Sequence, residues 1–142
     1  MKLELKHLAP YLPYGLKCQL LDEFNSELEF VGISNVNWVE LHEIGRAVTE
    51  KYPYKEVKPI LRPLSAITKE IAEDFYYYDE PFDTFEVMGL TIIYRYNGKS
   101  DSIHIEMDKG IERIDKMNKH HIDYRGLIEK GLAIDINTIS NY

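Results

Sequence analysis

Alternating apolar and polar residues in the first half of the chain predict short β-strands. Leu16, Cys18 and Leu20 fall on one side of an extended backbone, with polar residues between them. Pro59 lies in another extended stretch, and because proline cannot donate a ladder hydrogen bond we expect that strand at a sheet edge. Strands this short and this close in sequence predict a small antiparallel β-meander, with an SH3-like half-barrel as one arrangement. The expected strands cover residues 16–20, 28–33, 36–41 and 58–63.

Two later segments have the spacing of amphipathic helices. After Pro63, apolar residues recur three or four positions apart, and Ser65 is the expected N-cap. The second helix is expected from about Lys109 to His121, with Asp108 as its cap. Alternation over residues 132–136 predicts a short final strand. The two apolar stripes are Leu64, Ile67, Ile71 and Phe75 in the first helix, and Ile111, Ile114, Met117 and Ile122 in the second.

The dipeptide Asn97-Gly98 predicts a β-hairpin between these helices. Both residues adopt positive φ readily, as a two-residue type I′ turn requires. The resulting register gives one apolar face and one mostly polar face, as expected for a strand pair packed on a core. The apolar pairs are Ile92–Ile103, Leu90–Ile105 and Met88–Met107, and the polar pairs are Thr91–His104, Ile93–Ser102 and Arg95–Ser100.

Together these elements predict an α+β protein with a single domain over residues 1–142. A chain of 142 residues can bury a core without disulfide support. Cys18 is the only cysteine, so neither an intrachain disulfide nor a thiolate zinc cluster can form. Within the domain, sub-lobes can be drawn at residues 1–63, rich in strands, and 64–142, with the order helix–hairpin–helix.

The distribution of charge and hydrophobicity bears on location and partners. The N-terminal residues contain no apolar run of the kind a secretory signal needs. The longest uncharged apolar stretch, 88–94, is about a third of the ~20 residues of a membrane helix. We therefore expect a cytoplasmic protein without membrane contact. The formal net charge of -7 argues against duplex nucleic acid as a partner, because phosphate binding depends on Lys and Arg.

The most unusual segment, residues 73–86, is called the acidic-aromatic segment below. It contains six acids, six aromatic residues and no base. Exposed tyrosines favour binding, and acids beside them favour a basic partner. In the alternative interpretation, Phe75, Phe82 and Phe85 anchor a loop to the core and the acids are merely solvated. The candidate partner-binding residues are Tyr76, Tyr77, Tyr78, Asp79, Glu80, Phe82 and Asp83.

A basic stretch with interleaved tyrosines suggests a second kind of site. Bases beside aromatic rings can hold a phosphate and stack a nucleotide base, so Lys55, Lys58 and Arg62 are candidate phosphate-binding residues. The chain contains no glycine-rich phosphate loop, and a solvated loop that balances nearby acids is the alternative. A small phosphorylated ligand such as a nucleotide is therefore an alternative to a protein partner.

A metal-dependent enzyme is the second alternative. His104 and Glu106 share one face of a strand, and Asp108 follows at the next position on that side. A simple polar strand face explains the same pattern. We find no established catalytic, metal-binding or cofactor motif, so the main expectation is a non-enzymatic binding protein that uses no cofactor. Self-association through the hairpin edge is a further possibility.

Three stretches of the chain resemble a protein family found in phages and mobile elements of gut bacteria. They are Lys2 to Lys17 (KLELKHLAPYLPYGLK), Lys58 to Ile71 (KPILRPLSAITKEI) and Gly126 to Thr138 (GLIEKGLAIDINT). The resemblance implies a phage or prophage accessory protein that acts inside a bacterial host on a host or phage protein. It implies no activity and supplies no catalytic residues. Residues 72–125 lie outside the resemblance.

Overall fold

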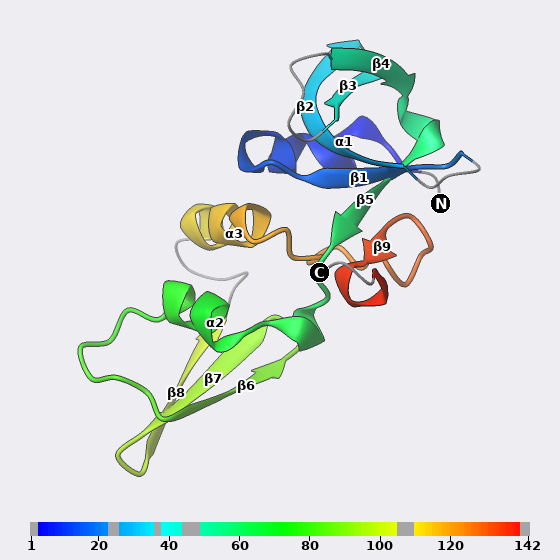
Figure 1. Cartoon of the computed structure of the whole chain (residues 1–142). Helices are drawn as coiled ribbons and strands as arrows, with labels where there is room; N and C mark the ends of the chain where they lie inside the picture. The colour runs from blue at the N-terminus through cyan, green and yellow to red at the C-terminus, as the bar shows by residue number, and fades with distance from the viewer. Residues whose placement is uncertain (1–2, 23–25, 36–37, 44–48, 105–109, 140–142) are drawn as a thin grey trace.

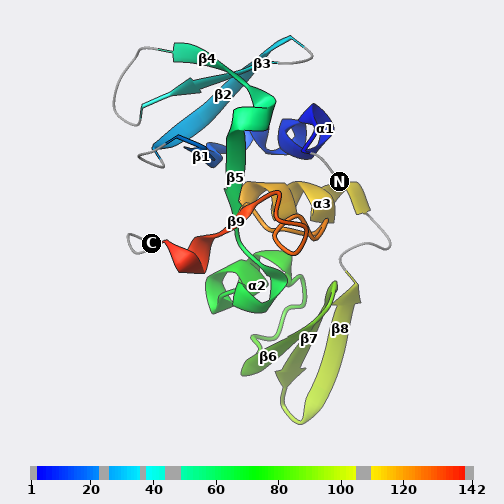
Figure 2. The same cartoon turned by 90° about the vertical axis from the view of Figure 1, so that its right-hand side faces the viewer.

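The computed structural model describes residues 3–22, 26–35, 38–43, 49–104 and 110–139. Figure 1 shows two β-sheets at opposite ends of the molecule, and the turned view of Figure 2 agrees that helix α3 (Gly110–Lys119) lies between them. Most strand pairs are antiparallel and the helices are few and short, which confirms the predicted α+β class.

The larger sheet contains the predicted meander. Its first four strands pair in sequence order, and after a 3-10 turn at Tyr54–Glu56 the fifth strand returns beside the first. These five strands therefore have the connectivity expected of an SH3-like half-barrel. The strand order is β4-β3-β2-β1-β5-β9, with β1 Lys17–Leu20, β2 Glu27–Asn35, β3 Trp38–His42, β4 Thr49–Pro53, β5 Val57–Leu61 and β9 Ile134–Asp135.

The edge position predicted for the strand of Pro59 is wrong. Strand β5 pairs with β1 on one side, where Pro59 is opposite Cys18, and with β9 on the other. The β9 ladder involves only Ile60 and Leu61, so β5 is covered on that side beyond the proline. The final strand is also shorter than predicted, because a 3-10 turn begins at Ile136.

The smaller sheet contains the predicted hairpin. Asn97 and Gly98 have φ values of 46° and 74°, as a type I′ turn requires, and Ile92 is opposite Ile103. The three predicted polar pairs are also present. The order is β6-β7-β8, with β6 Thr84–Met88, β7 Thr91–Tyr96 and β8 Lys99–His104.

Strand β6 was not predicted, and it corrects one expected pair. Gly89 has φ 59° and allows the chain to turn, so Met88 lies in β6 opposite Thr91. The predicted pairing of Met88 with Met107 is therefore wrong. Ile105 and Met107 lie outside the described residues, so the predicted pairing of Leu90 with Ile105 stays a prediction.

Helix α2 begins later than the apolar periodicity suggested. Thr68, not Ser65, caps α2 (Lys69–Phe75): its Oγ1 accepts a hydrogen bond from Ile71 N at 3.4 Å. Ser65 lies in a 3-10 turn that directly follows Pro63, so the chain turns once before α2 begins. Helix α3 lies within the range predicted for the second helix. The expected cap of that helix, Asp108, lies outside the described residues. Helix α1 spans Leu5–Leu8.

The buried side chains form two clusters. The first lies in the larger sheet and also contains Leu127 and Ala133, from the part of the sequence that was assigned to the second sub-lobe. The second joins α2 and α3 to the smaller sheet, and Tyr124 packs against both clusters. The second cluster contains Ile67, Ile71, Ala72, Phe75, Phe82, Ile92, Tyr94, Ile103, Met117 and Ile122.

A buried hydrogen bond connects the two clusters. Tyr11 belongs to the first cluster, and its hydroxyl donates to the carbonyl of Ile122 in the second at 2.8 Å. Burial raises the pKa of Tyr11 well above its ordinary value, so the phenol stays neutral and remains a donor. The backbone of Arg62 adds two bonds at this junction, from its N to His121 O and to its O from Asp123 N, both 2.8 Å.

We predict that Tyr11→Phe destabilises the protein by about 0.5–1.5 kcal/mol, because it removes a buried hydrogen bond and leaves the Ile122 carbonyl with the backbone N–H of Tyr124 at 3.1 Å. Urea unfolding measures this change. Tyr14→Phe is the control, since the Tyr14 hydroxyl donates to Asp115 at the surface and its loss should have a smaller effect. Equal stability of Tyr11→Phe and the wild type would contradict the assigned role of Tyr11.

Candidate functional site

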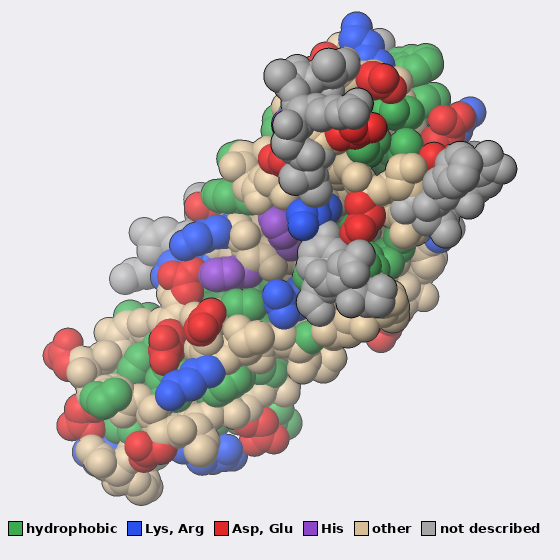
Figure 3. Space-filling model, viewed as in Figure 1, with side chains coloured by type: hydrophobic (Ala, Val, Ile, Leu, Met, Phe, Trp, Pro, Cys, Tyr) green, Lys and Arg blue, Asp and Glu red, His purple; other side chains and the backbone are tan. Residues whose placement is uncertain are grey.

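The acidic-aromatic segment runs from the end of α2 to β6, at the end of the molecule that holds the smaller sheet (Figure 1). Residues 76–83 form neither helix nor strand. In Figure 3, acidic side chains surround hydrophobic ones at this end. The predicted partner-binding residues therefore belong to one loop that is supported by α2 and β7.

Aromatic rings in this loop form a continuous stack from the core to the surface. At its base, Tyr94 of β7 is fully buried, and its ring centroid lies 4.7 Å from that of Tyr76. The ring of Tyr76 is 5.4 Å from Tyr78, and Tyr78 stacks on Tyr77 at 4.8 Å. Tyr77 ends the stack with 64% of its surface exposed, whereas Tyr76 and Tyr78 are half-buried.

Phe82 needs a correction. It is only 8% exposed and packs edge-on against Tyr94 at 4.9 Å, so it belongs to the core and not to the exposed face. Phe75 is buried as well, and Phe85 is half-buried. The alternative interpretation, in which phenylalanines anchor the loop to the core, is thus confirmed for Phe75 and Phe82. It does not extend to Tyr77.

Hydrogen bonds fix the loop against the hairpin. The Tyr76 hydroxyl donates to the carbonyl of Glu80, and Asn97 Nδ2 donates to the Glu80 carboxylate at 2.9 Å. The Tyr94 hydroxyl donates to Ala72 O in α2 at 2.5 Å. Because these bonds form within the protein itself, the loop is held in one shape before any partner arrives.

The hydroxyls of Tyr76, Tyr78 and the neighbouring Tyr96 remain neutral at physiological pH, because each has a raised pKa. Donation to Asp101 raises the pKa of Tyr96 to about 12. Partial burial raises the pKa of Tyr76, and a hydrogen bond with Tyr77 raises that of Tyr78. The negative charge of this face therefore comes from carboxylates alone, and Asp79, Glu80 and Asp83 are exposed.

A concavity of about 280 Å³ lies beside the stack. Tyr76, Tyr78 and Phe82 form its aromatic wall, and Glu73 and Asp79 place carboxylates on its rim. Among the described residues that line it, Lys69 is the one base. A guanidinium or ammonium group could therefore meet both ring faces and carboxylates here.

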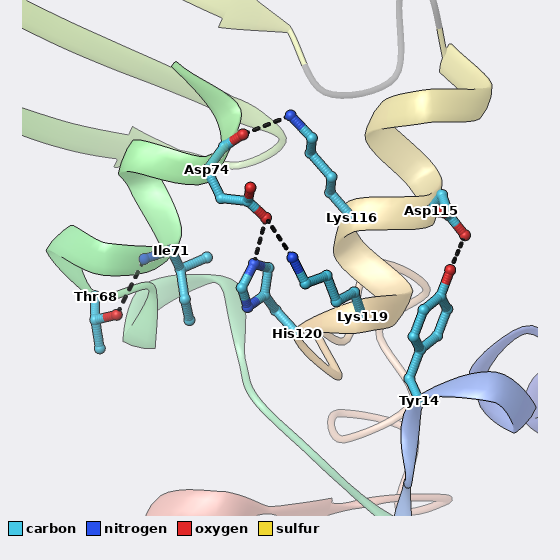
Figure 4. A network of polar contacts seen from close by, with 8 residues as sticks. All are labelled: Tyr14, Thr68, Ile71, Asp74, Asp115, Lys116, Lys119 and His120. Carbon is cyan, nitrogen blue, oxygen red and sulfur yellow. Dashed lines mark hydrogen bonds and ion pairs between the residues drawn. The ribbon is translucent and has the colours of Figure 1, made fainter. Parts of the chain in front are cut away.

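Asp74, also in the acidic-aromatic segment, faces inward and bridges two helices (Figure 4). Its Oδ2 lies 2.7 Å from His120 Nε2 and 3.6 Å from Lys119 Nζ, and its backbone oxygen accepts from Lys116 Nζ at 2.5 Å. Burial favours the neutral acid, but the hydrogen bond of His120 and the nearby lysine charges outweigh it and lower the pKa of Asp74. Asp74 therefore holds α2 to α3.

The three candidate phosphate-binding residues do not come together. Lys55 and Lys58 line one groove, which Arg62 does not line. Arg62 Nη1 donates to Ala66 O at 3.2 Å, and its backbone pairs with residues 121–123. The two lysines therefore share a surface that Arg62 does not line, and phosphate binding by these residues stays a prediction.

The candidate metal-binding strand face is described only in part. His104 Nδ1 lies 2.9 Å from Thr91 Oγ1, which engages it in a hydrogen bond across the hairpin. Glu106 and Asp108 lie outside the described residues. Within the described ranges, no group of three His, Cys, Asp or Glu side chains is placed to hold a metal ion. Cys18 is buried, and this burial raises the pKa of its thiol to about 12.

Comparison with protein-family models, curated proteins and solved structures finds no match for this chain. None of the helices in the described ranges has the length and hydrophobicity needed to cross a bilayer.

We predict that Asp74→Asn destabilises the protein at pH 7 by about 0.5–1 kcal/mol, because it removes a partly exposed ion pair. The folded-state pKa lies below the ordinary value of 3.8, so this contribution is complete well above pH 3.8. It should disappear as the pH falls through 3.8 and then through the folded-state pKa.

Urea unfolding of both proteins at a series of pH values measures the difference. Asp79→Asn, which neutralises an exposed acid, is the matched control. A stability difference between Asp74→Asn and the wild type that does not change with pH would contradict the electrostatic role of Asp74.

Proposed function

We propose that this protein acts by binding a partner protein that presents a basic surface, without making or breaking covalent bonds. The binding face comprises Tyr77 and the exposed acids Asp79, Glu80 and Asp83. The observation that carries the proposal is the largely exposed ring of Tyr77 at the end of an aromatic stack that begins in the core. We call this surface the Tyr77 face.

The stack makes the Tyr77 face suitable for binding. An aromatic ring that is already fixed loses little conformational freedom when a partner covers it, and tyrosine combines an apolar ring with a polar hydroxyl. Tyr77 stacks on Tyr78, and Tyr78 contacts Tyr76. Tyr76 in turn packs on the buried ring of Tyr94, so the ring of Tyr77 is supported from the core. A partner would therefore meet a preformed surface.

The charges select the kind of partner. Three exposed carboxylates lie within five residues of one another, in a protein whose net charge is -7. Such a surface accelerates association with a basic protein and disfavours an acidic one. Because exposed charges are screened by salt, binding at this face should weaken as ionic strength rises.

The resemblance of three stretches to a family of phage and mobile-element proteins supplies the setting of the proposal. We place the protein in the bacterial cytoplasm as a phage or prophage accessory protein, with a host or phage protein as its partner. The two alternatives have less support: Arg62 lies apart from Lys55 and Lys58, and the described part of the metal-binding strand face offers only His104.

We predict that Tyr77→Ala weakens partner binding at least about thirtyfold, as expected for a central aromatic contact worth ~2 kcal/mol. Affinity capture from host lysate identifies the partner, and titration with the purified partner measures the change. Met88→Ala is the matched control, since Met88 is also largely exposed but lies in strand β6. Undiminished binding by Tyr77→Ala would remove the main support for the proposal.

The charge contribution is tested by neutralising the acids while retaining their shape. In the triple variant Asp79→Asn, Glu80→Gln and Asp83→Asn, we expect slower association and a smaller dependence of affinity on salt. The control carries Glu56→Gln, Glu70→Gln and Glu129→Gln, which removes three exposed charges elsewhere. Identical rates and salt dependence in the two triple variants would exclude an electrostatic role of the Tyr77 face.

A further inference from the structure

A second aromatic surface lies in the larger sheet, at the other end of the molecule from the Tyr77 face (Figure 1). It consists of two adjoining hollows of about 330 and 470 Å³ that share Tyr54 and Lys55. We call it the lysine groove. Its lining residues are Leu3, Leu21, Trp38, Pro53, Tyr54, Lys55, Val57, Lys58 and Leu132.

The fold brings these residues together from several elements. Trp38, at the start of β3, pairs with Pro53 at the end of β4, and Tyr54 begins the 3-10 turn that leads to β5. Lys58 lies in β5, beside the C-terminal segment that supplies Leu132. The lysine groove is thus built on the paired strands of the meander.

Large apolar side chains are exposed here. Trp38 is 40% exposed and Leu21 is 51% exposed, whereas Tyr54 and Leu132 are partly buried against the first core cluster. Tryptophan and tyrosine are the side chains that most often dominate binding energy at protein interfaces. Their presence in one hollow marks a contact surface.

The charge of the lysine groove is opposite to that of the Tyr77 face. Among the described residues that line it, Lys55 and Lys58 carry the only charges, in a protein of net charge -7. The hollows at Glu73 and Asp79, and at Asp123 and Glu129, have acids in their lining. The lysine groove therefore attracts an anionic partner.

We infer that the lysine groove binds an extended acidic peptide segment of a partner protein. An apolar or proline side chain of the peptide lies between Trp38 and Tyr54, and aliphatic side chains cover Leu21 and Leu132. Its carboxylates meet Lys55 and Lys58. A peptide fits better than a small molecule, because small ligands need a site that encloses most of their surface, whereas these hollows adjoin along an open face. Lys55 and Lys58 attract carboxylates as point charges. Arg62, whose planar guanidinium group could bind a carboxylate through two hydrogen bonds, does not line the groove.

The chain has a built-in reporter for this binding. Trp38 is its only tryptophan and lines the lysine groove, so the change in its fluorescence measures occupancy directly. We propose selecting displayed random peptides of 12 residues on the wild-type protein, followed by fluorescence titration with the purified peptides. The expected peptides are rich in Asp and Glu, with interspersed aliphatic, proline or aromatic residues. Their binding should weaken as salt is added.

The test variant is Lys55→Glu combined with Lys58→Glu, which should bind the selected peptides at least about tenfold more weakly. Lys51→Glu combined with Lys99→Glu is the matched control: it makes the same charge change at two exposed positions that line neither hollow, and should bind normally. Circular dichroism confirms that the variants fold. If the double variant fails to fold, Lys55→Glu alone replaces it, because Lys55 is exposed.

Four results would overturn the inference. They are the absence of acidic residues from the selected peptides, equal binding by the double variant, a saturable Trp38 response to inorganic phosphate or octanoate, and self-association that the double variant abolishes. The third result would assign the lysine groove to a small anion, and the fourth to a second copy of the chain. Capture of a basic partner through the Tyr77 face should be unaffected by the double variant, so the two proposals can fail separately.

Discussion

The buried ring of Tyr94 is the constraint on which the proposed binding face depends. Strand β7 places this ring in the second core cluster, and its hydroxyl is bonded to α2. Tyr76 packs on it, and Tyr78 and Tyr77 follow outward. A loop with three acidic residues and no base would repel itself if it were free, but this stack fixes it against the core. The exposure of Tyr77 is therefore a consequence of packing inside the protein.

The two ends of the molecule carry opposite chemistry on similar aromatic supports. At the end with the smaller sheet, tyrosines are surrounded by carboxylates, and at the other end Trp38 and Tyr54 are accompanied by two lysines. The region between them is held by polar contacts, including the buried Tyr11 bond to Ile122 and the partly exposed Asp74 bridge to α3. We therefore propose that the two faces take up partners of opposite charge.

The parts of the fold that local sequence determines were predictable. Asn97-Gly98 specified both the turn and the register of the hairpin, because only residues that accept positive φ fit a type I′ turn. Strand β4 was not predicted because its residues, Thr-Glu-Lys-Tyr-Pro, do not alternate between apolar and polar. Strand β6 was not predicted because its alternation lies within the acidic-aromatic segment, which was expected to be a loop. The edge position predicted from Pro59 was wrong because a proline lacks only its own backbone N–H. Strand β9 pairs with the next two residues, Ile60 and Leu61, which have theirs.

The candidate site was predictable as a segment but not residue by residue. Composition identified residues 73–86, yet the sorting of Tyr77 to the surface and Phe82 to the core follows from packing on Tyr94, 12 residues or more along the chain. The His120 contact of Asp74 joins residues 46 apart and has no local signal. Lys55, Lys58 and Arg62 look equivalent in sequence, and only the pairing of Arg62 with residues 121–123 separates them.

The most direct measurement of the central claim is hydroxyl-radical footprinting of the protein alone and bound to its captured partner. Oxidation at each side chain reports its solvent exposure, and Met88 serves as an exposed internal reference in the same molecule. The account predicts that Tyr77 is readily oxidised in the free protein and protected in the complex, while Met88 is oxidised equally in both. Equal oxidation of Tyr77 with and without a bound partner would contradict it.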